Sequence, residues 1–202
     1  TSSVVLGDVN GDGYLDLIEG ILVDQPNRVF LNDGNGFFTD SGQLLGSSST
    51  TAIALGDVNG DGYPDLVEGN RGGQSNRIFL NDGFGFFTDS GQAIGSYNTY
   101  SVALGDVNQD GHLDFVEGGV AQSTYTYLND GSGSFSFLSI TYGGVFGTFS
   151  IALGDVNNDG YPDLVEGNTA NTQVFLNDGL GNFNSPVQVL GAYYTFSIVL
   201  ED

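Results

Sequence analysis

Four short acidic segments carry most of the side chains that could do chemistry. The first segment, Asp8–Asp16, reads DVNGDGYLD and has oxygen-bearing side chains at its positions 1, 3, 5 and 9. Position 6 is glycine, and the backbone carbonyl of position 7 is available as a further ligand. Calcium takes six to eight oxygen ligands in irregular geometry, whereas magnesium requires a tighter octahedron and more water. The segment therefore predicts a calcium site.

The same pattern recurs three more times, with its first aspartates spaced by 49 residues. A solvated Asp/Asn/Gly turn explains one such segment, but it does not explain why every oxygen is retained in four. The sequence therefore predicts about four Ca²⁺ ions per chain. The candidate ligands, with position 7 contributing its carbonyl, are Asp8, Asn10, Asp12, Tyr14 and Asp16; Asp57, Asn59, Asp61, Tyr63 and Asp65; Asp106, Asn108, Asp110, His112 and Asp114; and Asp155, Asn157, Asp159, Tyr161 and Asp163.

Each segment also places a glutamate at position 12, namely Glu19, Glu68, Glu117 and Glu166. The spacing matches the EF-hand pattern, but that motif needs flanking helices, and here the flanks are β-branched and interrupted by glycine. In a strand, residues three positions apart face opposite sides, so we expect these glutamates outside the calcium shell. Two interpretations stay open: a hydrogen-bonded or solvated acid at a strand end, or part of a second cation or ligand site.

The residues around each acidic segment favour β-structure. In the fourth repeat, residues 150–153 precede the segment, 161–166 follow it, and 172–176 lead into an Asn-Asp-Gly hairpin turn. Repeats one and two continue into a further strand, GFFTDS. No sustained 3.6-residue periodicity appears, and four-stranded repeats of about 40–50 residues are typical of β-propeller blades. We therefore expect one all-β repeat domain over residues 1–202, with blades at approximately 3–51, 52–100, 101–149 and 150–196.

The segments LGDVNGDGYPDLVEGN and NRIFLNDGFGFF resemble the FG-GAP/VCBS repeat family, which also occurs in integrin α-chain heads and fungal propeller lectins. The resemblance covers all four repeats. It implies a β-propeller whose calcium loops join the first and second strand of each blade, with the ligands named above. Two features depart from the family: its propellers usually have about seven or eight blades, and its usual apolar residue at the position of Glu19 is acidic here.

Composition excludes several classes of function. The chain has 25 acids against three arginines and no lysine, a net charge of −22, which excludes a nucleic-acid binder that neutralises phosphates. The absence of cysteine removes disulfides, thiolate metal sites and cysteine nucleophiles. No apolar run approaches the length of about 18 residues that a membrane span needs. The chain opens at Thr1 without a basic or long apolar stretch, so we expect any signal peptide to have been removed already.

The sequence predicts a protein that is not an enzyme. The single histidine, His112, stands at position 7 of its loop, where only the carbonyl is needed, so we expect its side chain to point to solvent. The obvious acids are each repeated four times, and a catalytic pair of carboxylates is seldom four-fold.

Two functions fit a non-catalytic propeller: a calcium-binding structural or assembly module, or a calcium-stabilised module that binds carbohydrate or protein. Five residues could stack on sugars or hydrogen-bond to them, or they could be ordinary loop residues: Gln74, Tyr97, Asn98, Tyr100 and Gln122. We expect a secreted or cell-surface location, because loops without a bidentate twelfth ligand bind calcium at roughly 10⁻⁴–10⁻³ M, as extracellular modules do.

The end of the chain, residues 197–202, repeats the opening strand at 3–8 and reads as the start of a fifth repeat. In a closed four-bladed ring these two strands would claim the same place, and a surplus apolar strand recruits another chain. We therefore expect a homo-oligomer or polymer formed through the terminal strands. Two chains would close an eight-bladed ring, or each tail would enter the next protomer. A closed monomeric ring with a free tail is the alternative.

Overall fold

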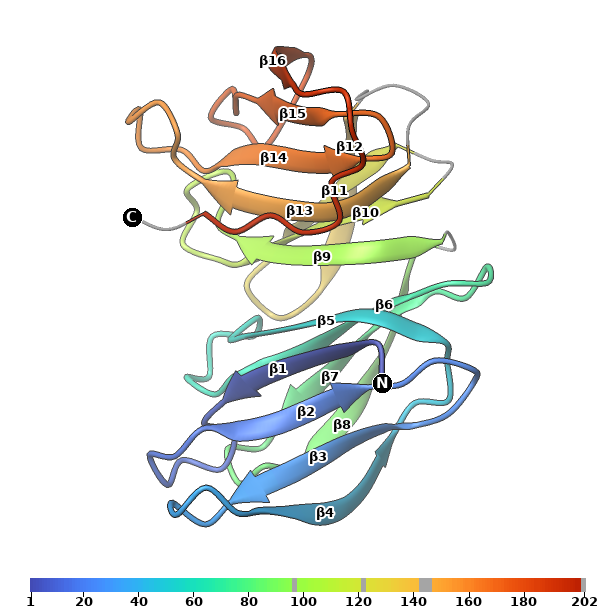
Figure 1. Cartoon of the computed structure of the whole chain (residues 1–202). Helices are drawn as coiled ribbons and strands as arrows, with labels where there is room; N and C mark the ends of the chain where they lie inside the picture. The colour runs from blue at the N-terminus through green and yellow to red at the C-terminus, as the bar shows by residue number, and fades with distance from the viewer. Residues whose placement is uncertain (96–97, 121–122, 142–146, 201–202) are drawn as a thin grey trace. The chain divides into compact units, whose positions relative to one another are not determined.

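The computed structural model describes residues 1–95, 98–120, 123–141 and 147–200, and within these ranges the chain is entirely β-structure (Figure 1). Sixteen strands form four antiparallel sheets of four strands each, and consecutive strands pair within every sheet. This confirms the predicted fold class of four four-stranded blades. The described residues contain no helix that is long and apolar enough to cross a membrane.

The chain divides into two compact units, Thr1–Tyr97 and Asn98–Asp202, with two sheets in each. The strands of the first unit are β1 (Ser3–Gly7), β2 (Asp16–Gly20), β3 (Asn27–Asn32) and β4 (Phe38–Leu45), followed by β5 (Thr50–Gly56), β6 (Asp65–Asn70), β7 (Asn76–Asn81) and β8 (Phe87–Ile94). Those of the second unit are β9 (Thr99–Gly105), β10 (Asp114–Gly119), β11 (Thr124–Asn129) and β12 (Phe135–Thr141), followed by β13 (Thr148–Gly154), β14 (Asp163–Asn168), β15 (Thr172–Phe175) and β16 (Pro186–Leu190).

Each acidic segment connects the first strand of its sheet to the second. In the first sheet Gly7 pairs with Asp16, so the ladder begins at the last residue of the nine-residue pattern. The same pairing closes the other three loops, with Gly56 opposite Asp65, Gly105 opposite Asp114 and Gly154 opposite Asp163. The four loops therefore occupy equivalent places in four equivalent sheets.

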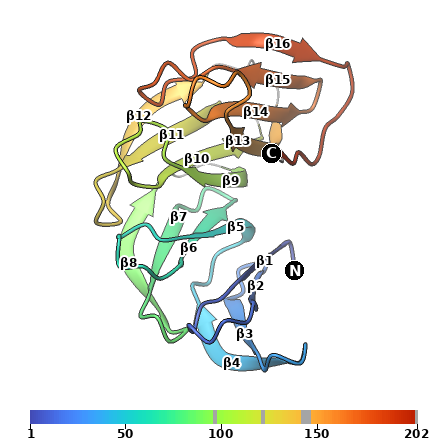
Figure 2. The same ribbon diagram turned by 90° about the vertical axis from the view of Figure 1, so that its left-hand side faces the viewer.

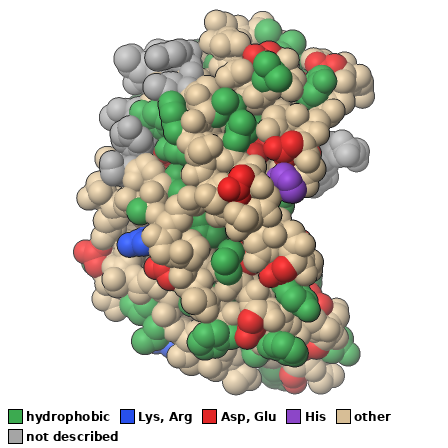
Figure 3. All heavy atoms as spheres, turned by 180° about the vertical axis from the view of Figure 1, so that it is seen from behind, with side chains coloured by type: hydrophobic (Ala, Val, Ile, Leu, Met, Phe, Trp, Pro, Cys, Tyr) green, Lys and Arg blue, Asp and Glu red, His purple; other side chains and the backbone are tan. Residues whose placement is uncertain are grey.

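Basic side chains are few on the face of the molecule that Figure 3 shows, where acidic side chains form separate small patches. Arg28 on β3 bonds to Asp40 on β4 at 2.5 Å, and Arg77 approaches Asp89 at the equivalent place in the second sheet, at 3.7 Å. Both pairs are partly solvent-exposed, so each contributes little to stability.

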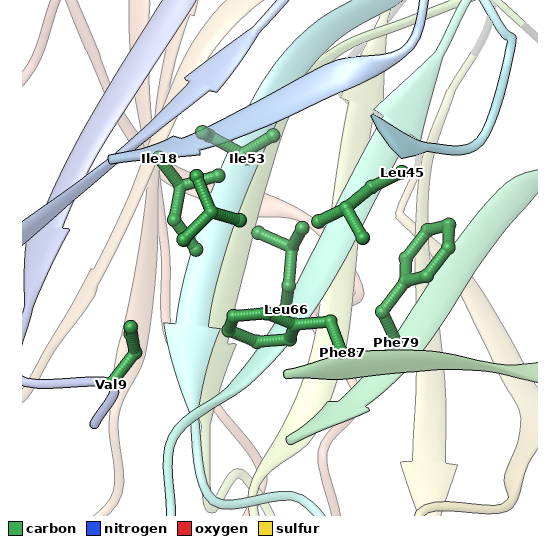
Figure 4. Packing of buried hydrophobic residues seen from close by; sticks show 8 residues of the cluster. Val9, Ile18, Leu45, Ile53, Leu66, Phe79 and Phe87 are labelled. Atoms are coloured by element: carbon green, nitrogen blue, oxygen red, sulfur yellow. The ribbon is translucent and has the colours of Figure 1, made fainter. Parts of the chain in front are cut away.

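The core of the first unit lies between its two sheets, which form two layers in Figure 2. We call the side of β1–β4 that lies in this contact the trailing face, and the side of β5–β8 that lies in it the leading face. The same names are used for the equivalent sides of the other sheets. The trailing face supplies Val9, Ile18, Val29 and Leu45, and the leading face supplies Ile53, Leu66, Phe79 and Phe87 (Figure 4). All eight side chains are at most 8% exposed.

The second unit repeats this contact with residues at the same positions. Val107 and Val116 of the trailing face of β9–β12 pack against the leading face of β13–β16, which supplies Ile151, Leu164, Phe175 and Phe183. The alternation of side chains along each strand thus produces two apolar faces per sheet, so that each sheet can be covered on both sides.

The terminal segment Thr195–Leu200 is not a regular strand, but it lies alongside β13 (Figure 1). The Ile198 N–H donates to the Ser150 hydroxyl at 3.0 Å. The last two residues of the predicted fifth-repeat strand, Glu201 and Asp202, lie outside the described residues.

Candidate metal centres in the acidic loops

Side chains at positions 1, 3 and 5 turn into each loop and hold its backbone. In the first loop the Asp8 carboxylate accepts hydrogen bonds from the Gly11 and Gly13 N–H groups, each at 2.8 Å. Asn10 Oδ1 accepts the Asp12 N–H at 3.0 Å, and Asp12 Oδ1 accepts the Tyr14 N–H at 2.9 Å. The oxygens of the predicted ligand set therefore line the inside of one turn.

Glycine at position 6 is required by the backbone of the loop. Gly13, Gly62, Gly111 and Gly160 have φ between 88° and 92°, a region that other residues rarely adopt. In each of the other three loops the position-6 N–H also donates to the first aspartate: Gly62 to Asp57 at 2.8 Å, Gly111 to Asp106 at 2.9 Å and Gly160 to Asp155 at 2.8 Å. The bond from Gly160 is the main reason why the pKa of Asp155 is lowered.

The aspartate at position 9 is fully buried in every loop. Asp65 Oδ2 accepts the Val58 N–H at 3.0 Å, and its Oδ1 accepts the Asn81 N–H at 2.8 Å. The residue thus joins the acidic loop to the end of β7, and Asp16, Asp114 and Asp163 make the equivalent pair of bonds.

Burial raises the pKa of Asp65 and of Asp114 to about 6. Two backbone hydrogen bonds oppose this shift for each carboxyl, and the other two aspartates of the same loop add to it. The three carboxylates of a loop therefore lie near enough to repel one another. A bound cation would remove this repulsion.

The donor set fits a hard divalent cation chemically. Each loop offers three carboxylates, one amide oxygen and one backbone carbonyl, and a carboxylate oxygen that accepts one N–H still has a free lone pair. The three carboxylates do not converge as they stand: no group of three or more Asp, Glu or His side chains among the described residues is arranged to hold a metal ion. Instead, the amide nitrogen of Asn10 donates to Asp12 Oδ2 at 2.9 Å, a contact repeated in the other loops.

The side chain at position 7 packs on the hairpin that follows the third strand. A Cβ atom added to Gly83 would stand 2.5 Å from the ring of Tyr63, and one added to Gly131 would stand 2.5 Å from the ring of His112. His112 is exposed, as expected, but its ring also covers this glycine. The ring leaves no room for a side chain at the glycine of the Asn-Asp-Gly turn, so this position requires glycine for a second reason besides the turn type. The sequence pattern alone does not indicate this contact.

The position-12 glutamates lie on the opposite side of the strand from the ligand aspartates; Glu68, Glu117 and Glu166 are buried, whereas Glu19 is half-buried. Glu68 Oε1 accepts the Asn27 side-chain N–H at 2.5 Å across the contact with the first sheet, while Oε2 has no hydrogen-bond partner. Glu117 accepts the hydroxyls of Thr99 and Tyr127 at 2.8 and 3.0 Å. Burial raises the pKa of Glu68 to about 7.

Glu166 occupies the same place in the fourth sheet, and burial raises its pKa to about 7. The hydroxyl of Thr124, from the preceding sheet, lies near enough to lower that pKa slightly, although neither Thr124 Oγ1 nor Glu166 Oε1 makes a hydrogen bond of ordinary geometry. Glu68 and Glu166 are thus acids of the contact between the two sheets of one unit, which favours the hydrogen-bonded interpretation over a second cation site.

Three of the residues suggested for sugar binding, Gln74, Asn98 and Tyr100, make contacts within their own units. Gln74 bonds through its Oε1 to the Ser49 N–H at 2.7 Å and through its Nε2 to Asp24 at 3.1 Å. The Tyr100 ring makes an edge contact with Phe149, 5.8 Å between centroids, and the Asn98 carbonyl accepts the Val120 N–H at 3.3 Å. Tyr97 and Gln122 lie outside the described residues.

The family model of the FG-GAP-like repeat matches residues 8–68, 57–117 and 118–166. The first two matches begin at the first aspartate of a loop, and all three end at a position-12 glutamate. The chain belongs to the FG-GAP-like repeat family. No curated protein matches the sequence significantly.

Two solved structures share the fold of these FG-GAP-like repeats. One is an Agrocybe aegerita lectin that recognises non-reducing terminal N-acetylglucosamine; it is 24% identical, with a TM-score of 0.58, and the match covers 95% of this chain and 52% of the lectin. The other is BBS1N in complex with ARL6DN, 12% identical, with a TM-score of 0.62, covering 96% of this chain and 55% of that one. The chain therefore spans about half the length of these two structures.

Proposed function

We propose that each acidic loop binds one Ca²⁺ ion, four per chain, and that the ions stabilise a non-catalytic structural module. The observation that carries this proposal is the four-fold recurrence of one oxygen-lined turn. In two of these turns the other two aspartates lie close enough to the buried position-9 aspartate to add to the rise in its pKa. The ligands would be the aspartates and asparagine at positions 1, 3, 5 and 9 and the position-7 carbonyl. A bound ion would supply the positive charge that these carboxylates lack.

The proposed location is extracellular. Each position-12 glutamate accepts a hydrogen bond from a residue outside its loop, so the loops would lack a bidentate twelfth ligand and would bind calcium at roughly 10⁻⁴–10⁻³ M. Calcium of that concentration is found outside cells. The non-catalytic part of the proposal is supported by the use of the buried acids and of His112 in packing and in backbone hydrogen bonds.

Thermal unfolding with and without calcium tests this function. For a site with a dissociation constant of about 10⁻⁴ M, 10 mM calcium stabilises the folded state by about 2.7 kcal/mol, so four sites would raise the melting temperature strongly over a sample in chelator. Magnesium at the same concentration is the control, and it should give a much smaller shift. Equal melting temperatures in calcium and chelator would contradict the proposal.

The structural role that we propose is assembly with further copies of the chain. Light scattering in millimolar calcium measures it without any added partner. A species well above the 21.2 kDa chain mass supports assembly, whereas a monomer at all concentrations opposes it.

Carbohydrate binding is the second candidate, favoured by exposed aromatic rings near the end of the chain. Tyr194 and Phe196 are 66% and 68% exposed and stack with centroids 6.0 Å apart. Flat exposed aromatic rings suit the apolar faces of sugars, and the lectin of similar fold binds N-acetylglucosamine. A glycan array run in calcium, with Tyr194→Ser as the comparison, tests it: binding that this variant loses would support the candidate, and an empty array would exclude it.

A further inference from the structure

The leading face of the first sheet has no covering partner among the described residues. It forms an open groove of about 370 Å³ lined by Val4, Leu17, Glu19, Phe30 and Phe38. Val4 is 52% exposed and Phe38 is 43% exposed, which is unusual for large apolar side chains that share one concave surface.

Every residue of this groove has a buried counterpart 49 positions later. The counterparts are Ile53, Leu66, Glu68, Phe79 and Phe87, all at most 8% exposed. They are covered by Val9, Ile18, Val29 and Leu45 of the preceding sheet (Figure 4), while Asn27 donates to Glu68. The chain itself thus shows what covers a leading face: an aliphatic trailing face with one hydrogen-bond donor opposite the glutamate.

The trailing face of the fourth sheet offers that combination and is only partly covered. Val156 and Leu190 are 45% and 44% exposed, whereas their counterparts in the first sheet, Val9 and Leu45, are 1% and 4% exposed. Thr172 stands where Asn27 stands in the first sheet, since it pairs with Leu190 as Asn27 pairs with Leu45. The third sheet also has a threonine at this position, Thr124, and it lies near Glu166 of the following sheet.

The terminal segment occupies the place where a following sheet would put its first strand. Leu200 Cβ lies 3.6 Å from a Cβ added to Gly154, just as Leu153 Cβ lies 3.8 Å from one added to Gly105. The Thr195 N–H donates to the Asn168 carbonyl at 3.1 Å, the counterpart of the 3.1 Å bond from Thr50 to Ile21. Residues 1–6 of the chain, TSSVVL, have the same pattern as the segment TFSIVL at 195–200.

We propose that the leading face of β1–β4 docks on the trailing face of β13–β16 of a second copy of this chain, and that the docking β1 displaces residues 195–200 of that second copy. This inference rests on the assembly role proposed above and assigns its surfaces. Burial of Val4 and Phe38 against Val156 and Leu190 supplies the apolar contact, and Thr172 meets Glu19. The contact is head-to-tail, so it generates a closed ring or an open chain of copies.

A charge placed in the groove tests the docking face. Val4→Asp removes no core contact, since half of the side chain is exposed, but it would bury an unpaired carboxylate in the dimer. We expect it to raise the dissociation constant measured by analytical ultracentrifugation in millimolar calcium by about tenfold or more. Phe84→Asp, at a 79% exposed position in the turn between β7 and β8, is the matched control and should leave association unchanged.

A reversible lock on the terminal segment tests the displacement. The Cβ separation of 3.6 Å between positions 154 and 200 suits a disulfide, and the chain has no native cysteine. Gly154→Cys with Leu200→Cys should associate when reduced and stay monomeric when oxidised. Gly105→Cys with Leu153→Cys, at 3.8 Å inside the second unit, is the control, whose association should not respond to oxidation. Melting temperatures in calcium show that each variant is folded.

The outcomes separate this inference from the assembly role. Association that is lost in Val4→Asp and in the oxidised lock supports the inference. Association that survives both changes overturns it and leaves assembly to another surface. A monomer in every sample, including the reduced lock, overturns both the inference and the assembly role, while the calcium proposal is judged separately by the melting temperatures.

Discussion

At the scale of single residues, the position-9 aspartate and the position-12 glutamate of the second repeat differ in role because their surroundings differ. Asp65 is buried yet accepts two backbone N–H groups, so its charge is compensated and it fixes the loop to β7. Glu68, three residues on, faces the neighbouring sheet, where Asn27 satisfies only one of its oxygens. The two N–H donors oppose the rise that burial gives the pKa of Asp65, which still reaches about 6, while burial raises the pKa of Glu68 to about 7.

Loss of one loop carboxylate should remove one ion. Asp12, Asp61, Asp110 and Asp159 are exposed and hold one or two backbone or side-chain groups within their own loops, so replacement by alanine should leave the fold intact. We expect each Asp→Ala variant to bind about one calcium fewer in equilibrium dialysis. Asp40→Ala removes an exposed ion pair with Arg28 and a hydrogen bond from the Gly42 N–H but touches no acidic loop, so it is the control and should keep the full number. A loop variant that keeps the full number would remove that loop from the set of sites.

The buried Glu68 should make stability depend on pH in an unusual direction. Its folded-state pKa is raised by burial from 4.5 to about 7, so the folded protein binds this proton more tightly than the unfolded chain does. The stabilisation is present below pH 4.5 and is lost as the pH rises towards 7. Glu68→Gln should therefore increase the free energy of unfolding at pH 8 by roughly 1–3 kcal/mol relative to the wild type.

Urea unfolding at pH 5 and pH 8, both in saturating calcium, measures this difference. The gain from Glu68→Gln should be much smaller at pH 5, where the wild-type carboxyl is largely protonated. Asp40→Asn, at an exposed position, should show no such dependence. A glutamine variant that is less stable than the wild type at pH 8 would show that the carboxylate is ionised and well paired.

At the scale of the elements, the position-7 ring and the hairpin glycine act as one unit. Gly83 has a φ of 79°, and an added Cβ would overlap the ring of Tyr63. Gly83→Ala should therefore destabilise the protein by about 1–3 kcal/mol, through backbone strain and overlap together. Gly91→Ala, with a φ of 80° and open space around the added methyl group, measures the strain alone. Equal losses of unfolding free energy in the two variants would mean that the ring contact has no energetic role.

The loops and hairpins could be predicted because their residue types state their local geometry. The pattern predicts a strand before the fourth loop at residues 150–153, and β13 spans Thr148–Gly154. It predicts another at residues 172–176, and β15 spans Thr172–Phe175. Alternation also placed Asp16 and Glu19 on opposite sides of β2. The contact between sheets could not be predicted, because alternation says which side a residue faces but not which residue covers it. Asn27 reaching Glu68 across 41 positions is such a case.

At the scale of the whole molecule, the acidic charge is the feature that any account of this chain must explain. The net charge of −22 on 202 residues means that the carboxylates of the folded chain repel one another. Twelve of the 25 acids lie in the four loops. Four bound Ca²⁺ ions would bring the net charge to −14 and would place each positive charge in a loop that carries three carboxylates. The folding of the chain is then coupled to calcium, as expected when a ligand binds the folded state alone.

The number of calcium ions per chain tests the central claim most directly. Equilibrium dialysis of the 202-residue chain against rising calcium, up to several millimolar, should saturate at four ions per chain, with loop variants saturating at three. Saturation at none or one ion per chain would contradict the claim that these four loops are calcium sites.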